Sequence, residues 1–357
     1  MNNIARIQAQ LIESNLDALL IFDEKNQRFA AGFPFTDGAV IVAREKAFLL
    51  TDSRYIEAAE RIAGGCADVR MFDRQHPLTG LIRAALQEVG AERLGAEEES
   101  LNHARWAALE RQLGVTLQPA QAILRTLRAS KTDEEIQSMI RAQRVSEKAL
   151  EEVLQIIRPG MTEREVMAEL VYHMLKNGSE GNSFDPIVVT GKNTSMPHGV
   201  PGDEVIRAGD FITMDFGSLK DGYCSDMTRT VAVGSATEEM KNVYYTVLKA
   251  QLAGIAAARA GVLGREIDGA ARRVIADAGY GEYFGHGFGH CLGLDIHEWP
   301  FAGPRGEVPM PAGSLSSAEP GIYLPGRFGV RIEDVMIIRE DHAEVITKAP
   351  KNELIVL

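Results

Sequence analysis

Apolar positions in residues 1–126 follow two alternating spacings. Ile4, Ile7 and Leu11 recur at helical intervals, and the run at 17–22 that follows is almost entirely apolar. Similar short runs at 39–43 and 47–50 precede a second helical stripe at 78–89. Short apolar runs between helical stripes are typical of buried strands that alternate with helices. This rhythm predicts a small α/β domain.

A polar segment at 127–136 separates this part from the rest of the chain. Within it, Thr132 and Glu135 have the spacing of a capping box, which marks the start of a helix. We therefore expect two domains, 1–126 and 127–357, joined by a short connection.

The second part contains an internal repeat. Residues 158–178 align with 259–279 at a constant offset of 101, and both copies show a helical pattern that begins and ends near glycines. Each copy precedes a strand-like run, AGDFITMDFG (208–217) or AGSLSSAEPG (312–321), in which Asp215 corresponds to Glu319. The repeat predicts a domain of two pseudo-symmetric α/β halves.

The next acids in the two halves, Asp226 and Glu333, also correspond. If the halves pack about a pseudo-two-fold axis, four carboxylates meet at one site. Without compensation they would repel one another and their pKa values would rise, whereas two divalent ions would balance their charge. The alternative is that each acid lies exposed on a strand whose side chains alternate between core and solvent.

Histidines supply the remaining candidate ligand. His286, His290 and His297 lie in one glycine-rich run at 284–300, and His198 lies at a roughly equivalent place in the first half. The glycines disfavour the helical two-histidine zinc motif and favour a turn that leads into a strand. A carboxylate-rich site with one imidazole suits Mn²⁺, and a water shared by two metals has a pKa near 7, so the expected chemistry is hydrolysis.

Composition excludes several classes of protein. The chain has 38 Lys and Arg against 50 Asp and Glu, and no dense basic block, so nucleic acid is not an expected partner. Glu13 and Asp17 interrupt any secretory signal, and no apolar run approaches the roughly 18 residues of a membrane span. We expect a cytoplasmic protein without a membrane partner. The three cysteines form no C-x-x-C pair, which argues against disulfides and thiolate metal sites.

Five motifs in order, MDFG…DMTRT, HGFGH, DIHE, AEPGIY and GVRIED, resemble the pita-bread metallopeptidases, in particular the Xaa-Pro aminopeptidase and prolidase branch. FAAGF (29–33) and LLTDSRY (49–55) resemble the creatinase-type N-terminal domain of that family. The resemblance implies hydrolysis of the peptide bond that precedes proline, in small peptides with proline at the second position. It also implies a homodimer and two divalent ions, Mn²⁺ or alternatively Co²⁺ or Zn²⁺, held by Asp215, Asp226, His290, Glu319 and Glu333.

The resemblance implies further roles for side chains around these ligands. Glu319 would serve as general base, and His198 and His297 would bind the substrate carbonyl and the tetrahedral intermediate. His286, Tyr323 and Arg331 would line the pocket for the proline ring or the carboxylate that follows it. Arg331 could instead orient Glu333, two residues away on the same strand face.

Other interpretations remain open. An Xaa-Pro dipeptidase would use the same chemistry as the aminopeptidase. A metal-free creatinase-like hydrolase or a binding protein of this fold would lack the ligands, a methionine aminopeptidase would share the catalytic domain, and an interaction protein would leave the acids solvated. Phe288 and Cys291, which flank His290, could reshape the substrate pocket.

Overall fold

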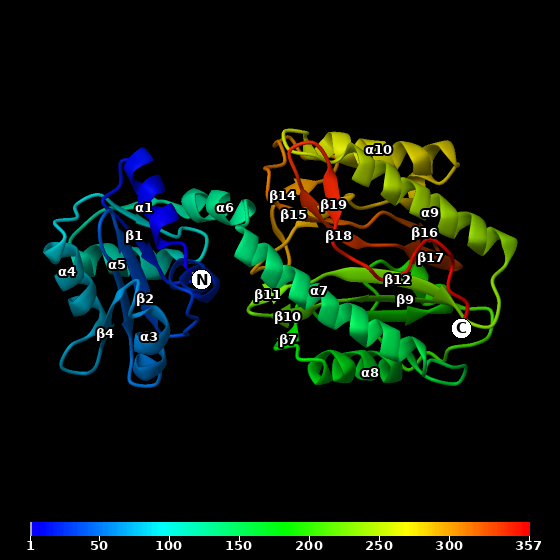
Figure 1. The fold of residues 1–357 in the computed structure, drawn as a ribbon, viewed down its shortest axis with the longest axis horizontal. Helices are drawn as coiled ribbons and strands as arrows, with labels where there is room; N and C mark the ends of the chain where they lie inside the picture. Colours follow the sequence, from blue (N-terminus) through cyan, green and yellow to red (C-terminus); the bar gives the residue numbers. More distant parts are fainter. Residues whose placement is uncertain (1) are drawn as a thin grey trace. The chain divides into compact units, whose positions relative to one another are not determined.

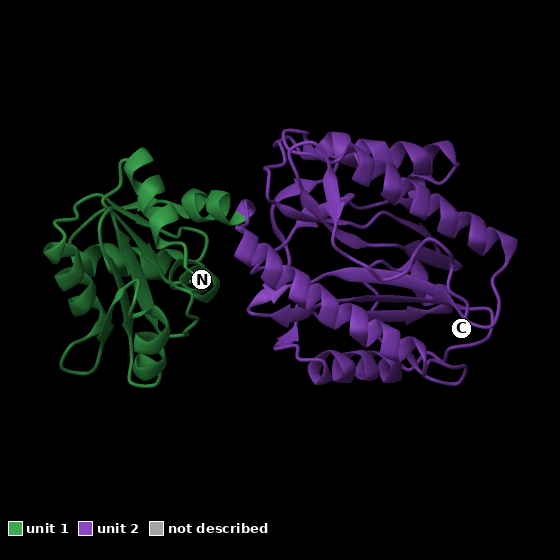
Figure 2. Ribbon diagram, in the orientation of Figure 1, with its two compact units in different colours: residues 1–128 green, residues 129–357 purple. Residues whose placement is uncertain are grey.

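The computed structural model describes residues 2–357, which form two compact units divided between Arg128 and Ala129 (Figure 2). The boundary proposed from the sequence, 126/127, falls two residues earlier, within the helix α6 (Gln121–Ala129). None of the helices in the described residues is long and apolar enough to cross a membrane.

Unit 1 is built on a six-stranded sheet in the order β4-β3-β2-β1-β5-β6. The strands are β1 (Ala18–Ile21), β2 (Gly38–Ala43), β3 (Ala47–Thr51), β4 (Asp68–Met71), β5 (Leu94–Ala96) and β6 (Leu117–Pro119). Besides α6, the helices are α1 (Ile4–Glu13), α2 (Glu24–Ala31), α3 (Ile56–Ala63), α4 (Leu78–Glu88) and α5 (His103–Leu113). The apolar runs at 17–22, 39–43 and 47–50 thus form the buried centre of the sheet, and the predicted α/β domain is confirmed.

Unit 2 contains the predicted pair of equivalent halves. Each half has two helices followed by a three-stranded antiparallel arrangement, β12-β9-β8 in the first half and β18-β15-β13 in the second. The first half comprises α7 (Asp133–Leu154), α8 (Glu163–Lys176), β8 (Ile187–Thr190), β9 (Phe211–Phe216) and β12 (Met227–Ala232). The second comprises α9 (Glu238–Ala257), α10 (Gly264–Asp277), β13 (Gly289–Cys291), β15 (Leu315–Ala318) and β18 (Asp334–Ile338).

The repeat has a local cause in the backbone. Helices α8 and α10 start and end at positions 101 residues apart. Each is preceded by a glycine at positive φ, Gly160 (96°) or Gly261 (81°), and followed by another, Gly178 (96°) or Gly279 (87°). Residues with a Cβ rarely adopt this conformation, so the matched glycines place the same turns in both halves.

Shorter elements complete unit 2. They are β7 (Gly181–Asn182), β10 (Ser218–Lys220), β11 (Tyr223–Cys224), β14 (Glu298–Ala302), β16 (Gly321–Leu324), β17 (Phe328–Arg331), β19 (Ala343–Val345) and the 3₁₀ turns η1 (Gly191–Ser195) and η2 (Gly281–Tyr283). Strands β10 and β11 join through Asp221 and Gly222, both at positive φ, which is the two-residue hairpin that Asp-Gly favours.

The apolar core of unit 2 also has two parts. One lies between α7, α8 and the first-half strands and includes Leu170, Ile212 and Val231. The other lies between α9, α10 and the second-half strands and includes Val247 and Ile267. In Figure 1, α8 and the pair α9 and α10 lie on opposite sides of the strands. The strand faces turned away from the helices are therefore free to carry polar side chains.

Candidate metal centre

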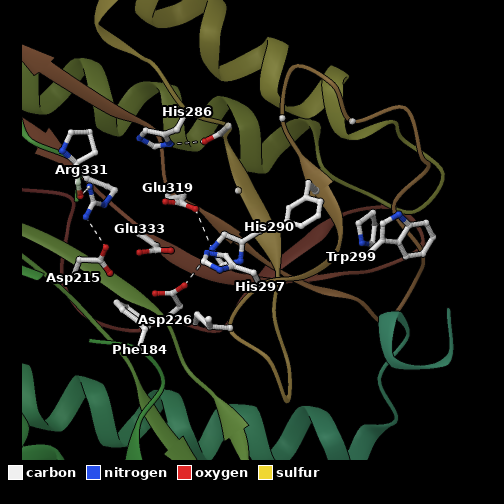
Figure 3. A pocket seen from close by; sticks show the side chains of 18 of the residues that line it. Phe184, Asp215, Asp226, His286, His290, His297, Trp299, Glu319, Arg331 and Glu333 are labelled. Carbon is white, nitrogen blue, oxygen red and sulfur yellow. Dashed lines mark hydrogen bonds and ion pairs between the residues drawn. The ribbon is translucent and has the colours of Figure 1, made fainter. Parts of the chain in front are cut away.

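A cavity of about 760 Å³ opens between the two halves of unit 2 (Figure 3). It is lined by all five predicted ligands and by four of the five other predicted site residues: Asp215, Asp226, His290, Glu319, Glu333, His198, His286, His297 and Arg331. Tyr323 is the exception, because it lies behind this wall.

The acids come from equivalent places in the two halves. Asp215 lies near the end of β9 and Glu319 directly follows β15, while Asp226 and Glu333 directly precede β12 and β18. The fifth residue breaks the symmetry. His290 lies in the middle of β13, whereas the equivalent strand β8 has buried apolar side chains at its centre, Val188 and Val189.

Three of the side chains form a tight, buried group. One potential ligand atom from each of Asp226, His290 and Glu333 lies within 4.8 Å of the others. His290 Nε2 is 3.6 Å from Asp226 Oδ2 and 3.3 Å from Glu319 Oε1. Thr228 Oγ1 donates to Glu333 Oε2 at 2.7 Å, and Glu333 lines the cavity.

Burial and mutual repulsion dominate the electrostatics of this group. Burial, followed by the neighbouring acids, raises the pKa values of Asp226 and Glu333 well above their usual range. Burial also raises the pKa of Glu319 to about 7. It lowers the pKa of His290, so the imidazole supplies no positive charge to balance the acids. A cation among these carboxylates would favour their ionised forms.

The donor atoms also fit a cation. His290 Nδ1 donates to the carbonyl of Cys291 at 3.1 Å, and so the Nε2 lone pair faces Asp226 and Glu319, which are acceptors themselves. Asp215 Oδ1 is buried and has no hydrogen-bond partner among residues 2–357. Oxygen and imidazole acceptor atoms that point toward one another are what a divalent ion requires.

Arg331 closes one end of the cavity. Its Nη2 donates to Asp215 Oδ2 at 2.6 Å, and its Nη1 donates to the hydroxyl of Tyr323 at 2.8 Å. That hydroxyl lies 2.9 Å from His286 Nε2. Burial lowers the pKa of His286 to about 4, so its neutral ring accepts from Tyr323.

This network changes two sequence-based expectations. Tyr323 holds His286 and Arg331 from behind and does not line the cavity, in contrast to its predicted place in the wall. Arg331 pairs directly with Asp215, because Asp215 on β9 reaches the end of β17 from the other half, and it is linked to Glu333 only through the hydroxyl of Thr228. Register along a single strand could not show this contact.

The remaining histidines lie on the cavity wall. The rings of His290 and His297 are 4.3 Å apart between centroids and are edge to face. Burial, followed by the nearby His290 and His198, lowers the pKa of His297. His198 is exposed and follows the turn η1. From the sequence, His198 has a roughly equivalent place in the first half to that of His297 in the second, and both histidines line the same cavity.

Several wall residues were not predicted. Phe184 lies near Asp226, and the cavity extends past the imidazoles to Trp299, at the far side of Figure 3 from Arg331. The sequence HEWP, which begins at His297, was the signal that could have pointed to Trp299 as a wall residue. Phe288 and Cys291 do not line the cavity, because both are fully buried in the second-half core. The ring of Phe288 packs against Gly254, where a Cβ would lie 2.3 Å from it.

A duplicated α/β unit with four acids, two of them buried and two half-buried, and one imidazole around a cavity defines a metal-dependent hydrolase. Comparison with known families agrees with this class. The sequence pattern of metallopeptidase family M24 matches residues 137–340, and that of the creatinase/prolidase N-terminal domain matches residues 3–130. The chain belongs to metallopeptidase family M24.

Individual relatives cover nearly the whole chain. An uncharacterised peptidase of Bacillus subtilis, YqhT, is 37% identical over 96% of both chains, and an Xaa-Pro dipeptidase of Pyrococcus horikoshii is 34% identical over 95% of both. Among solved structures, an Xaa-Pro dipeptidase from Bacillus anthracis has a TM-score of 0.94, with 40% identity and 99% of each chain covered. An X-Pro aminopeptidase from Thermotoga maritima has a TM-score of 0.93, with 33% identity over 98% of this chain and 99% of that one.

Proposed function

We propose that the protein hydrolyses the peptide bond that precedes proline, as an Xaa-Pro aminopeptidase acting on small peptides with proline at the second position. The observation that carries this proposal is the convergence of Asp215, Asp226, His290, Glu319 and Glu333 on one cavity. Relatives named Xaa-Pro dipeptidase and X-Pro aminopeptidase, each matching nearly the full length, support the choice of substrate.

These five side chains would hold two divalent ions. Mn²⁺ is our choice, with Co²⁺ or Zn²⁺ as alternatives, because oxygen donors outnumber the single nitrogen donor. When bound, such ions polarise a carbonyl and lower the pKa of water to about 7. The metal-free creatinase-like alternative is disfavoured, since every predicted ligand is present and lines the cavity.

Glu319 is the proposed general base. Ser317 Oγ donates to Glu319 Oε1 at 3.1 Å and thereby fixes the rotation of the carboxylate at the edge of the cavity. Glu319 would take a proton from the attacking water and deliver it to the proline nitrogen as the peptide bond breaks.

His297 and His198 would donate hydrogen bonds to the substrate. Charge develops on the carbonyl oxygen as the tetrahedral intermediate forms, and an imidazole N–H aimed at that oxygen stabilises it. Proline nitrogen carries no hydrogen, so the site cannot select its substrate by accepting a hydrogen bond from that atom. We propose that the wall formed by His286 and Arg331, supported by Tyr323, selects for the ring by shape.

The test is hydrolysis of Ala-Pro, Ala-Pro-Ala and Met-Ala by protein stripped of metal and reloaded with Mn²⁺. We expect cleavage of Ala-Pro-Ala in the loaded protein only. Cleavage of Ala-Pro alone would show the dipeptidase, which the names of several relatives favour. Cleavage of Met-Ala alone would favour a methionine aminopeptidase, and no cleavage would contradict the proposal. Cytoplasmic location and dimerisation stay predictions.

A further inference from the structure

A buried ion pair lies behind the metal centre. Lys131 Nζ donates to Glu298 Oε2 at 3.0 Å, and the two side chains are only 2% and 7% exposed. Lys131 lies at the start of unit 2, 167 residues before Glu298, which opens β14 directly after His297. Neither residue lines the cavity, and the proposed reaction uses neither of them.

The second oxygen of Glu298 holds a turn. Glu298 Oε1 accepts from the backbone N–H groups of Leu294 (3.1 Å) and Asp295 (3.2 Å). The carboxylate occupies the inside of this turn, because a Cβ on Gly293 would lie 2.7 Å from Glu298 Oε2. The ion pair therefore fixes the backbone between Gly293 and His297.

This turn contacts a proposed metal ligand. The carbonyl of Cys291 accepts a hydrogen bond from His290 Nδ1 at 3.1 Å. Cys291 pairs with Glu298 across β13 and β14, at a bulge that follows His290. The same turn ends at His297, whose ring contacts that of His290. A continuous set of contacts thus joins Lys131, through Glu298 and the turn, to both imidazoles.

We propose that Lys131 and Glu298 are positioning residues, which hold His290 in the orientation that presents Nε2 to the metal and hold His297 beside it. The inference rests on the metal centre of the proposed function and extends it to a pair outside the cavity. The physical reason is that a ligand histidine keeps its tautomer and angle only while acceptors hold its other nitrogen. The pair is buried, and removal of one partner takes away the opposite charge that the other partner faces, which is costly.

The first test compares Lys131→Met with the unaltered protein. Methionine keeps much of the lysine side-chain volume and removes the charge, so Glu298 loses the lysine ammonium and the turn loosens. We expect affinity for Mn²⁺, measured by competition with a fluorescent chelator, to fall about 10- to 100-fold. We also expect the visible absorption spectrum of bound Co²⁺ to change. Unchanged affinity and spectrum in folded protein would contradict the proposal.

A double variant keeps the test valid if Lys131→Met folds poorly. In Glu298→Gln, the amide oxygen can still accept from the turn, but the amide N–H₂ group then faces the lysine ammonium. In the double variant, Lys131→Met with Glu298→Gln, the amide N–H₂ group faces methionine, and neither position carries a buried charge. We expect the double variant to bind Mn²⁺ more tightly than either single variant. If the losses of Mn²⁺ affinity in the two single variants simply add in the double variant, the proposed coupling between Lys131 and Glu298 is contradicted.

Glu97 of unit 1 provides a matched control. It is fully buried, and its Oε2 likewise accepts from two consecutive backbone N–H groups, those of Phe22 and Asp23. Glu97→Gln should lower the melting temperature and leave Mn²⁺ affinity unchanged. If Glu97→Gln lowers Mn²⁺ affinity as much as Glu298→Gln does, the loss of affinity comes from general destabilisation of the protein. That result would overturn the proposal. Because affinity is measured without substrate, failure of the peptidase assay would not affect this result.

Discussion

The two halves of unit 2 share a plan but differ at the metal centre. Both present two acids, one at or just beyond the end of a strand and one before the next strand. Only the second half adds an imidazole, His290, where the first has valines. The second half also supplies Arg331, which pairs with Asp215 of the first half.

This difference shows how a duplicated fold acquires an asymmetric site. Equivalent backbones bring four carboxylates together, and mutual repulsion then makes the site depend on cations. Arg331 compensates Asp215 directly, whereas Glu319, the counterpart of Asp215, lies beside a neutral imidazole. Equivalent acids are therefore expected to respond differently to removal, and the following predictions test that expectation.

The largest effect is expected where the halves are most alike. Asp226→Asn and Glu333→Gln should each lower kcat/KM on the order of 10³-fold or more, because each removes the negative charge of a proposed metal ligand. Hydrolysis assays and metal analysis should show similar losses of activity and of bound metal, with circular dichroism unchanged. A variant that keeps full activity would remove its residue from the ligand set.

Stability should separate Asp215 from Glu319. In metal-free protein, Asp215→Asn leaves Arg331 buried without its carboxylate and should lower the free energy of unfolding by about 3 kcal/mol. Glu319→Gln removes one of the repelling acids and should leave stability equal or higher. Urea unfolding of the two variants measures this difference. Equal losses in the free energy of unfolding would show that Arg331 does not make the two equivalent acids behave differently.

His297→Ala should lower kcat about 100-fold with little change in KM, since the proposed hydrogen bond strengthens only as the oxyanion forms. Steady-state kinetics on the best Xaa-Pro substrate measures the two constants separately. The matched control is His198→Ala in the first half, which we expect to affect KM more. A change confined to KM in His297→Ala would argue for a role in substrate binding alone.

The smallest effect concerns pH. The folded pKa of Glu319, about 7, lies above its ordinary value of 4.5, so the folded state binds the proton more tightly than the unfolded state. The contribution of Glu319 to the stability of metal-free protein should therefore be greatest below pH 4.5 and be lost as pH rises from 4.5 to about 7. In Glu319→Gln, the free energy of unfolding should depend less steeply on pH across this range. An unchanged slope would assign the dependence to other groups.

Much of the site was predictable because its signals are local or repeated. Asp215 and Glu319 occupy the same position in matching motifs, and the glycines that flank each copy require particular turns. The hairpin at Asp221 and Gly222 and the helix start at Thr132 also follow from neighbouring residues alone. In each case the physical cause lies within a few residues of the pattern.

The amino-acid order by itself determined two α/β units, the duplicated halves and the identity of the acids. The reason is that sequence spacing alone sets which residues lie on the same face of a helix or strand. Only the tertiary structure decided which partners meet: Arg331 with Asp215, Tyr323 behind His286, Lys131 with Glu298, and Phe288 in the core. These contacts join residues far apart along the chain. They depend on how the elements pack, and no local periodicity contains that information.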